Sequence, residues 1–367
     1  MADKIRVGIV GATVTPGGSG WGANAHVPAL GILPDFELKA VCTAHQETAE
    51  ASKAAFGAEL AFDNIDAMAN HPEVDVVVVC VRVPWHKDLV MAGLKAGKPV
   101  FCEWPLGANL AEAEEMANYA REHSLQTFVG LQGRNDPTIR YAADLVADGY
   151  VGRVLTANLH VVGGQVIERG AGRLWQREAK NGANTLTISG GHNIDALCTI
   201  LGEFTEVQAR TTTQITEWID TDNGNAPVPV DSPDTIIVAG RLASGADVSI
   251  HVTAVPIGAT GTRLEIFGDQ GALILDSRGS LSGGPNTISG AKAGERPTEL
   301  TVPDTYTVVP EGTPAGPPRN VGQAYVAMAD TLEGKPSQAP DFALAVQRHK
   351  LIDAIERSSR DGVAVKL

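Results

Sequence analysis

Short β-rich apolar runs alternate with helical segments over roughly the first 150 residues, and this alternation restricts the possible folds more than any other feature. The clearest run, residues 74–81, is an almost unbroken row of valines, which is typical of a parallel strand buried on both faces. An amphipathic helix is expected at residues 85–96 and ends at Gly97. Repeated strand–helix units of this kind predict a doubly wound parallel sheet with helices on both faces.

The other elements of this region keep the same order. Further strands are expected at residues 5–10, 38–42, 99–102 and 127–131. Further helices are expected at residues 23–30, 47–56, 110–122 and 137–148. Asn109 and Asp136 precede two of these helices and are typical caps of a helix N-terminus.

After about residue 150 the pattern changes to β-rich runs separated by turns. The runs lie at residues 153–162, 206–215, 235–241, 247–255, 263–267 and 272–275, with a hairpin signal at 267–272. Helices are expected at 189–201, 320–332 and 341–357, and loops rich in Gly, Pro and Asn at 222–233, 277–294 and 310–318. The sequence predicts an α/β chain of two domains, 1–132 and 133–367. The second domain is an α+β domain with a large, mainly antiparallel open sheet, and its last helix, 341–357, is expected to pack back toward the first domain.

Composition excludes several classes of partner. Acidic residues outnumber basic ones by 43 to 29, giving a net charge of −14, whereas binding to nucleic acid or an anionic membrane needs a basic surface. The N-terminus lacks the apolar core of a signal peptide and no apolar run has transmembrane length, so we expect a cytoplasmic protein. The four cysteines occupy apolar runs and form no C-x-x-C pair, which predicts reduced, buried thiols and no metal site.

The turn after the first strand, Gly8-Ile9-Val10-Gly11-Ala12-Thr13, is a candidate phosphate-binding turn. In the dinucleotide fold, glycines let the backbone approach a pyrophosphate at a helix N-terminus. The strict G-x-G-x-x-G spacing is broken, because its second glycine falls on Thr13, and a longer glycine loop follows and includes Gly20 and Trp21. The alternatives are a long loop that wraps phosphates with backbone N–H groups and a flexible surface loop.

The end of the second strand bears on the choice of cofactor. An acidic residue normally binds the ribose hydroxyls of NAD there, but this chain has Thr43. A neutral residue removes the repulsion that would exclude a 2′-phosphate, yet no arginine follows to bind one. The cofactor is therefore predicted to be NAD or NADP, with the choice open.

Over nearly its whole length the chain resembles the glucose–fructose oxidoreductase / inositol dehydrogenase (Gfo/Idh/MocA) family. The matching segments are residues 8–11, 81–86, 102–106, 190–195 and 345–367, in the family's order and spacing. The long glycine loop, the Glu103-Trp104-Pro105 triplet and residues 130–134 are most similar to the branch that contains the fungal galactose-pathway corepressor.

Two positions depart from the family pattern. Members usually have E-K-P where this chain has Glu103-Trp104-Pro105, and that lysine binds the reacting hydroxyl and assists proton transfer. The family motif D-x-G-x-H-x-x-D is matched at Gly190, His192 and Asp195, but its first aspartate falls on Ile188. The histidine of this motif is present, as His192.

The resemblance implies a site made from both domains. His192 is the expected proton acceptor, a role that imidazole fills well near neutral pH. Asp195 would orient the imidazole or simply pair with a neighbour, and Trp104 would stack on a sugar face or on the nicotinamide. Cofactor contacts are expected from Gly8, Gly11, Ala12, Thr13, Gly20, Trp21, Thr43, Val81, Val83, His86, Glu103 and Trp104. Substrate contacts are expected from Gln132, Arg134, His160, Trp175, Lys180 and His192.

Several of these assignments have plain structural alternatives. Arg134 would contact the substrate or cofactor, or pair with Asp136. Lys180 would replace the missing lysine or be an ordinary solvated lysine. His86 would lie near the cofactor ribose or simply begin a helix.

Two classes of function follow. One is an NAD(P)-dependent dehydrogenase or reductase that acts on a secondary alcohol of a sugar, polyol or glycoside. The other is a catalytically silent NAD(P)-binding regulator. Family members are commonly dimers or tetramers that associate through the open face of the second domain's sheet, so a homodimer or homotetramer is expected, with a carbohydrate-like small molecule as substrate.

Overall fold

The structure is a computed structural model that describes residues 4–14, 20–164 and 166–367. The chain forms two compact units. The first unit contains Met1–Leu131 and Val308–Gln347, and the second contains Gln132–Thr307 and Arg348–Leu367. The division between Leu131 and Gln132 lies one residue before the expected one, and the segment Val308–Gln347, expected in the second domain, clusters with the first unit.

The first unit is built on a six-stranded parallel sheet with the order β3-β2-β1-β4-β5-β6, which confirms the predicted doubly wound fold. The strands are β1 (Ile5–Val10), β2 (Phe36–Cys42), β3 (Leu60–Phe62), β4 (Val76–Val79), β5 (Val100–Glu103) and β6 (Thr127–Gly130). The strand order reverses direction between β1 and β4. In open sheets of this type, ligands bind outside the carboxyl ends of the strands at such a switch point.

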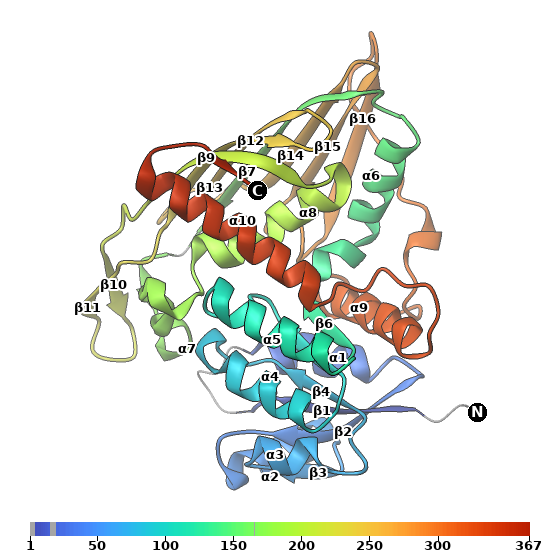
Figure 1. Cartoon of the computed structure of the whole chain (residues 1–367), viewed down its shortest axis with the longest axis vertical. Helices are drawn as coiled ribbons and strands as arrows, with labels where there is room; N and C mark the ends of the chain where they lie inside the picture. Colours follow the sequence, from blue (N-terminus) through green and yellow to red (C-terminus); the bar gives the residue numbers. More distant parts are fainter. Residues whose placement is uncertain (1–3, 15–19, 165) are drawn as a thin grey trace. The chain divides into compact units, whose positions relative to one another are not determined.

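Helices cover both faces of this sheet (Figure 1). They are η1 (Gly22–His26), α1 (Val27–Leu30), α2 (Gln46–Phe56), α3 (Ile65–Ala69), η2 (Val83–Trp85), α4 (His86–Lys95), α5 (Leu110–Glu122) and α9 (Pro317–Leu332). The predicted cap of α5 is confirmed, because the Asn109 side chain accepts a hydrogen bond from the Glu112 N–H. The expected helix at 23–30 instead begins as a π-helix, η1, and continues as α1.

Helix α9 explains why Val308–Gln347 belongs to the first unit. Its residues Val321, Tyr325 and Met328 are fully buried. They pack in one apolar cluster with Val7 and Ile9 of β1. The sheet therefore obtains part of the cover of one face from a segment that lies some 300 residues after η1 in the sequence.

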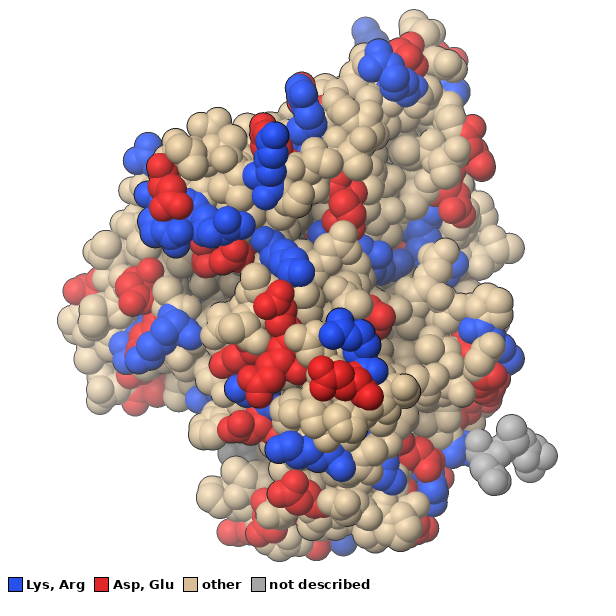
Figure 2. All heavy atoms as spheres, in the orientation of Figure 1, with Lys and Arg blue, Asp and Glu red and all other residues tan. Residues whose placement is uncertain are grey.

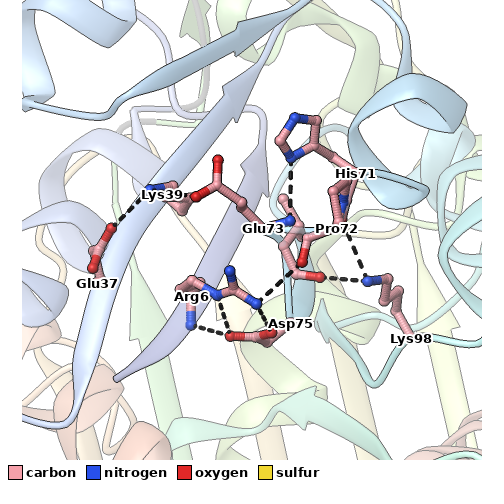
Figure 3. A network of polar contacts seen from close by, with 9 residues as sticks. Arg6, Glu37, Lys39, His71, Pro72, Glu73, Asp75 and Lys98 are labelled. Carbon is pink, nitrogen blue, oxygen red and sulfur yellow. Dashed lines mark hydrogen bonds and ion pairs between the residues drawn. The ribbon is translucent and has the colours of Figure 1, made fainter. Parts of the chain in front are cut away.

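Ionic contacts join the amino-terminal ends of β1, β2 and β4 (Figure 3). Arg6 donates hydrogen bonds to both carboxylate oxygens of Asp75, from Nη2 at 2.7 Å and from Nε at 2.9 Å. Lys39 lies between the carboxylates of Glu37 and Glu73, at 3.5 and 3.4 Å. These contacts lie at the amino-terminal edge of the sheet, opposite the edge where a ligand is expected.

The second unit contains a nine-stranded sheet with the order β17-β16-β15-β14-β7-β13-β12-β9-β18. All neighbours are antiparallel except β7 and β13, which agrees with the predicted mainly antiparallel sheet. Its strands are β7 (Val154–Gly163), β9 (Phe204–Thr212), β12 (Thr235–Leu242), β13 (Asp247–Ala254), β14 (Gly261–Gly268), β15 (Gly271–Ser277), β16 (Asn286–Lys292), β17 (Thr298–Glu299) and β18 (Val365–Lys366). A second, three-stranded sheet contains β8 (Glu168–Arg169), β10 (Glu217–Asp220) and β11 (Ala226–Pro229).

Helices line one face of the nine-stranded sheet (Figure 1). The helical segments of this unit are η3 (Gln132–Asn135), α6 (Pro137–Ala147), α7 (Ala171–Leu174), η4 (Trp175–Arg177), η5 (Ala179–Asn181), η6 (Thr185–Gly190), α8 (Gly191–Leu201), η7 (Asp304–Tyr306) and most of α10 (Phe342–Asp361). Segments η6 and α8 pack on β7, β12 and β13. The predicted cap of α6 is confirmed, since Asp136 accepts hydrogen bonds from the Thr138 and Ile139 N–H groups.

Two stretches expected to be loops contain strands. Residues 277–294 include β16, which pairs with β15 over its whole length. Gly290 interrupts its pattern because a Cβ atom there would lie 2.5 Å from the Tyr150 hydroxyl. Residues 222–233 include β11, an edge strand whose prolines are tolerated because only one of its sides is paired.

The outward face of the nine-stranded sheet is more polar than the sequence suggested. Along β7 the buried side chains are Ala157, Leu159 and Val161, so Asn158 and His160 point to the other face. Ile237 is the largest apolar side chain exposed there, at 50%. An oligomer formed through this face remains a prediction.

Charged side chains of both signs are interspersed on the face of the molecule that Figure 2 draws. Within the described ranges, no helix is long and apolar enough to cross a membrane. All four cysteines are unpaired and buried, as predicted, and burial raises the pKa of Cys42 and of Cys198 to about 12.

Candidate functional site

The turn after β1 places a residue without a side chain, Gly11, at the carboxyl edge of the sheet. Gly11 has φ +102°, a conformation that favours glycine. A Cβ atom at this position would lie 2.1 Å from the carbonyl oxygen of Cys80, just beyond β4. The Gly11 N–H donates to the Cys42 carbonyl at the end of β2. The chain therefore crosses the switch point with no side chain in the way, which is the geometry that a pyrophosphate requires.

Gly22, the end of the predicted glycine loop, was given no role from the sequence, and it packs the next helix against this turn. A Cβ atom at Gly22 would lie 2.9 Å from the Cα atom of Ala12. This is the close helix–strand approach that the third glycine of the dinucleotide motif provides. Trp21, beside it, buries an indole N–H that has no acceptor among the described residues. The middle of the predicted glycine loop, residues 15–19, lies outside the described residues.

A pocket of about 660 Å³ opens over the carboxyl ends of β1, β2 and β4, inside the first unit. Its lining includes the predicted cofactor residues Gly11, Thr13, Thr43 and Val81. Sequence reasoning missed the other lining residues, which are Val10, Cys42, Ala44, His45, Thr48, Asp63, Asn64, Ile65, Arg82, Trp85 and Leu89. All of them lie at the carboxyl end of a strand or in the loop or helix that follows it, so the parallel topology itself was the signal that could have found them.

Groups of opposite charge line this pocket. Asp63 follows β3 and Arg82 follows β4. Thr43 and Thr48 share a hydrogen bond of 2.6 Å between their hydroxyl oxygens. Trp85 also lines the pocket, and its side chain is unusually open to solvent, at 62% exposed. An aromatic face of this kind can stack on a planar heterocycle such as adenine.

Three other predicted cofactor residues, Gly8, His86 and Val83, make packing contacts or hydrogen bonds within the first unit. Gly8 lies within β1, where a Cβ atom would meet the Val74 side chain at 2.9 Å. His86 is buried, with Nδ1 2.8 Å from the Pro105 carbonyl and Nε2 3.1 Å from the Val81 carbonyl, and burial lowers its pKa. A neutral imidazole carries one N–H, so it donates to only one of these oxygens. His86 thus links the segment after β4 to the segment after β5. Val83, in η2, is buried.

Glu103 takes part in a buried cluster that the sequence did not reveal. Its Oε1 lies 2.9 Å from His26 Nε2, and His26 Nδ1 lies 2.8 Å from the Tyr325 hydroxyl. Both contacts are satisfied by a neutral imidazole whose Nε2–H donates to Glu103 and whose Nδ1 accepts from the Tyr325 hydroxyl. Gly130 leaves room for this carboxylate, since a Cβ atom there would lie 2.6 Å from the Glu103 Cδ. The neighbouring Trp104 is also buried, with 5% of its surface exposed.

The second unit has its own ionic cluster, centred on Asp195 of α8. Arg134 Nε lies 3.0 Å from both Asp195 carboxylate oxygens, and Arg348 Nε lies 2.8 Å from Oδ1. Arg348 also contacts Glu203. Arg134 therefore pairs with Asp195, whereas Asp136 caps α6. The proposed orienting of His192 by Asp195 stays a prediction.

The remaining predicted substrate residues are spread over the second unit. His192 is half-buried on α8, and Gln132 is buried in η3. His160 lies on the outward face of β7, next to His251, with ring centroids 5.3 Å apart. The sheet therefore separates it from the helix that carries His192.

Neither Lys180 nor Trp175 gains support as a substrate residue from its contacts. Lys180 is 79% exposed and pairs with Glu178, as expected of a solvated lysine. The indole of Trp175 donates to the Gly172 carbonyl. Within the described ranges, no group of three or more His, Cys, Asp or Glu side chains is arranged to hold a metal ion.

Comparisons with known proteins agree with this architecture. Residues 5–131 match the family model described as "Oxidoreductase family, NAD-binding Rossmann fold", and residues 137–277 match "Gal80p, C-terminal domain". The chain is 32% identical to a dehydrogenase of Aspergillus oryzae, aclE, over 99% of this chain and 98% of that protein. It is 28% identical to the galactose/lactose metabolism regulatory protein GAL80 of Saccharomyces cerevisiae, over 81% of this chain and 73% of that protein.

Solved structures show the same fold. A super-repressor mutant of Gal80p from Saccharomyces cerevisiae superposes with a TM-score of 0.86 at 24% identity, over 99% of this chain and 98% of that chain. Levoglucosan dehydrogenase in complex with NADH and levoglucosan superposes with a TM-score of 0.84 at 22% identity, over 100% of this chain and 99% of that chain. The glycine turn, the pocket at the switch point and the match to a dehydrogenase over both full lengths lead to one conclusion: the chain belongs to the Gfo/Idh/MocA family of oxidoreductases with an NAD-binding Rossmann fold.

Proposed function

We propose that this protein is an NAD(P)-dependent oxidoreductase that moves a hydride between the nicotinamide and a secondary alcohol of a sugar, polyol or glycoside. The observation that carries the proposal is the pocket of about 660 Å³ over β1, β2 and β4, where Gly11 presents bare backbone. The dehydrogenase relative and the sugar dehydrogenase structures support the substrate class.

The residues of the first unit fit a dinucleotide. Gly11 and Thr13 would hold the pyrophosphate, and the buried indole N–H of Trp21 offers a further donor. The exposed face of Trp85 would stack on the adenine. When bound, the nicotinamide supplies or accepts the hydride, and the protein supplies orientation and proton transfer.

In the second unit, His192 is the proposed proton acceptor. Oxidation of a secondary alcohol releases the hydroxyl proton, and an imidazole that changes charge near neutral pH can take it. The two positions that would ordinarily assist are apolar here, namely Trp104 and Ile188. Catalysis therefore depends on a single imidazole, and the expected turnover is lower than in a site with a lysine beside it.

The choice between NAD and NADP stays open in this proposal. Asp63 could bind the ribose hydroxyls of NAD, whereas Arg82 could bind the 2′-phosphate of NADP, and both line the pocket. Titrating each cofactor separately by calorimetry decides between them. An Asp63→Asn variant should weaken NAD binding if that residue holds the ribose.

The whole proposal is tested by measuring the rate at which the protein reduces NAD or NADP with each of a panel of sugars, polyols and glycosides as substrate. We expect turnover of at least one compound and a loss of about 100-fold or more in His192→Ala, the usual size of a general-base contribution. His123→Ala is the matched control, because His123 is an exposed histidine at the end of α5. Turnover that survives in His192→Ala would overturn the assignment of the base, and failure to bind either cofactor would overturn the dinucleotide site.

A second candidate function is a catalytically silent NAD(P)-binding regulator. It is favoured by the apolar residues Trp104 and Ile188 and by the match of residues 137–277 to the C-terminal domain of Gal80p. Tight cofactor binding without turnover of any compound in the panel would support this alternative and exclude the enzyme.

A further inference from the structure

The second unit contains a pocket of its own, of about 180 Å³, that the proposed function does not use. It lies between the three-stranded sheet, the ends of β7 and β13, and the segment η6. A cavity of about 150 Å³ holds a molecule the size of benzene. This one therefore has room for a group of about six heavy atoms.

Arg169 supplies a positive charge and an unsatisfied hydrogen-bond donor to this pocket. Its guanidinium carbon lies 4.9 Å from the centre of the Trp218 ring, and its Nε atom is buried with no acceptor among the described residues. Burial and the nearby Arg173 both lower the pKa of Arg169. A buried N–H of a charged group without an acceptor is costly, so it marks a place where an acceptor is missing.

A second cation, Arg173, lines the same pocket. Arg173 faces the pocket, and no salt bridge to Arg169 or Arg173 is found in the described part of the chain. One carboxylate, Asp234, is among the described lining residues, and its charge partly offsets the two cations, but neutral donors hold its oxygens. Its oxygens accept hydrogen bonds from the Gln214 and Ile215 N–H groups and from the Thr235 hydroxyl. Two guanidinium groups therefore line one pocket beside a single carboxylate, and the pocket is left with a net positive charge in a chain of net charge −14.

The pocket adjoins the helical segment that carries the proposed base. Ile188 and Ser189 of η6 line it, and the chain continues directly into α8, where His192 lies one helical turn further on. A ligand group held by Arg169 is thus anchored in the same unit as His192. Thr185 and Ser189 add hydroxyl groups to the lining.

We propose that this pocket binds the oxyanion group, a carboxylate or a phosphate, of an acidic carbohydrate, with Arg169 and Arg173 as its ligands. Guanidinium groups bind both oxyanions through paired N–H donors. This inference rests on the proposed function for its substrate class, since it assigns an acidic end to the sugar or polyol. The apolar side of the pocket, formed by Trp218 and Val230, would contact the carbon skeleton beside the charge.

The test measures binding, so it does not depend on turnover. The full-length protein is titrated by calorimetry at low salt with D-glucuronate, D-gluconate and D-glucose 6-phosphate, each with and without saturating NADH or NADPH. D-Glucose and D-sorbitol are the neutral counterparts. We expect at least one acid to bind about tenfold or more tightly than its neutral counterpart. Comparison of the two sugar acids with the sugar phosphate identifies which oxyanion is bound.

Three variants locate the binding site. Arg169→Gln and Arg173→Gln should each weaken the acid about tenfold or more and leave the neutral compounds unchanged. Arg173 is exposed, so its replacement cannot fail merely by unfolding the protein. Arg153→Gln removes the same charge from a residue that is 75% exposed and outside the pocket, and should bind the acid as the unaltered protein does.

The outcomes separate this inference from the proposed function. Acid binding that needs Arg169 and Arg173, without hydride transfer to any compound, would support the pocket and overturn the enzyme. Turnover of neutral sugars with no preference for acids, or acid binding that is unchanged in Arg169→Gln and Arg173→Gln, would overturn the pocket and leave the enzyme.

Discussion

Replacing Asp195 by asparagine measures how strongly the buried ionic cluster stabilises the second unit. The side chains of Asp195 and Arg348 are 2% and 1% exposed, and that of Arg134 is 20% exposed. A hydrogen bond to a charged group contributes about 1.5–3 kcal/mol, and Asp195 accepts from two guanidinium groups. Removing one partner of a buried pair costs about 3–5 kcal/mol.

We expect Asp195→Asn to lower the free energy of unfolding by about 3 kcal/mol, at the lower end of that range. Asparagine keeps one neutral acceptor, and Arg348 keeps its contact with Glu203. For a domain of 150–250 residues, about 3 kcal/mol corresponds to a fall in Tm of roughly 6–12 °C. Urea unfolding followed by circular dichroism gives the free energy, and scanning calorimetry gives the Tm.

The control is Asp247→Asn, which breaks an exposed pair with Arg241 in the same unit. These side chains are 69% and 62% exposed, so we expect a change of no more than about 1 kcal/mol. Adding Arg348→Met to Asp195→Asn should restore part of the loss, because it removes a buried charge that has lost its Asp195 carboxylate and keeps only the half-exposed Glu203. A loss in Asp195→Asn no larger than that of the control would refute the reasoning.

Three further predictions concern the first unit and the thiols. Gly11→Ala should abolish cofactor binding in calorimetry, because its Cβ atom would clash with the Cys80 carbonyl. Gly97→Ala is the control and should leave binding unchanged, since Gly97 also has a positive φ, +72°, but has open space around it. Equal effects of the two variants would contradict the argument that the backbone at Gly11 must approach closely. Burial raises the pKa of Cys42 to about 12, so native protein at pH 8 should react with a thiol reagent only after unfolding; rapid reaction without denaturant would contradict this. Arg6 lowers the pKa of Asp75, so the unfolded state binds more protons in acid. The pair stabilises the fold above the ordinary carboxyl pKa near 4, and this stabilisation is lost as the pH falls through the lowered native value. Arg6→Met should therefore flatten the dependence of the urea midpoint on pH below about 4, and an unchanged slope would refute it.

The parallel sheet was predictable because its signal is local. A valine run such as residues 74–81 identifies a buried strand without knowledge of its neighbours, although β4 itself is shorter. β16 was missed for the opposite reason. Gly290 and the polar residues around it carry little strand propensity, and the strand forms because β15 offers it a paired edge.

Residues of the candidate site could be predicted from the sequence only where a backbone conformation requires one particular type of residue. Gly11 could be found because a positive φ and a close approach both demand glycine. The partners of Asp195 could not, because Arg348 lies 153 residues further along the chain and Arg134 had a nearer acid in Asp136. Arg169 and Arg173 were not singled out either, since nothing in a single sequence shows which arginines lack a carboxylate.

The place of α9 in the first unit has a consequence for how the protein is made. Residues 1–131 leave the ribosome first, but Tyr325, the hydrogen-bond partner of His26, is synthesised almost 200 residues later. Until then one face of the parallel sheet lacks part of its cover, because Val7 and Ile9 can pack with Leu30 of α1 but not yet with the residues of α9. The first unit therefore completes its folding only after Pro317–Leu332 has been synthesised, and the apolar side chains that α9 covers stay exposed until then, which favours binding by chaperones.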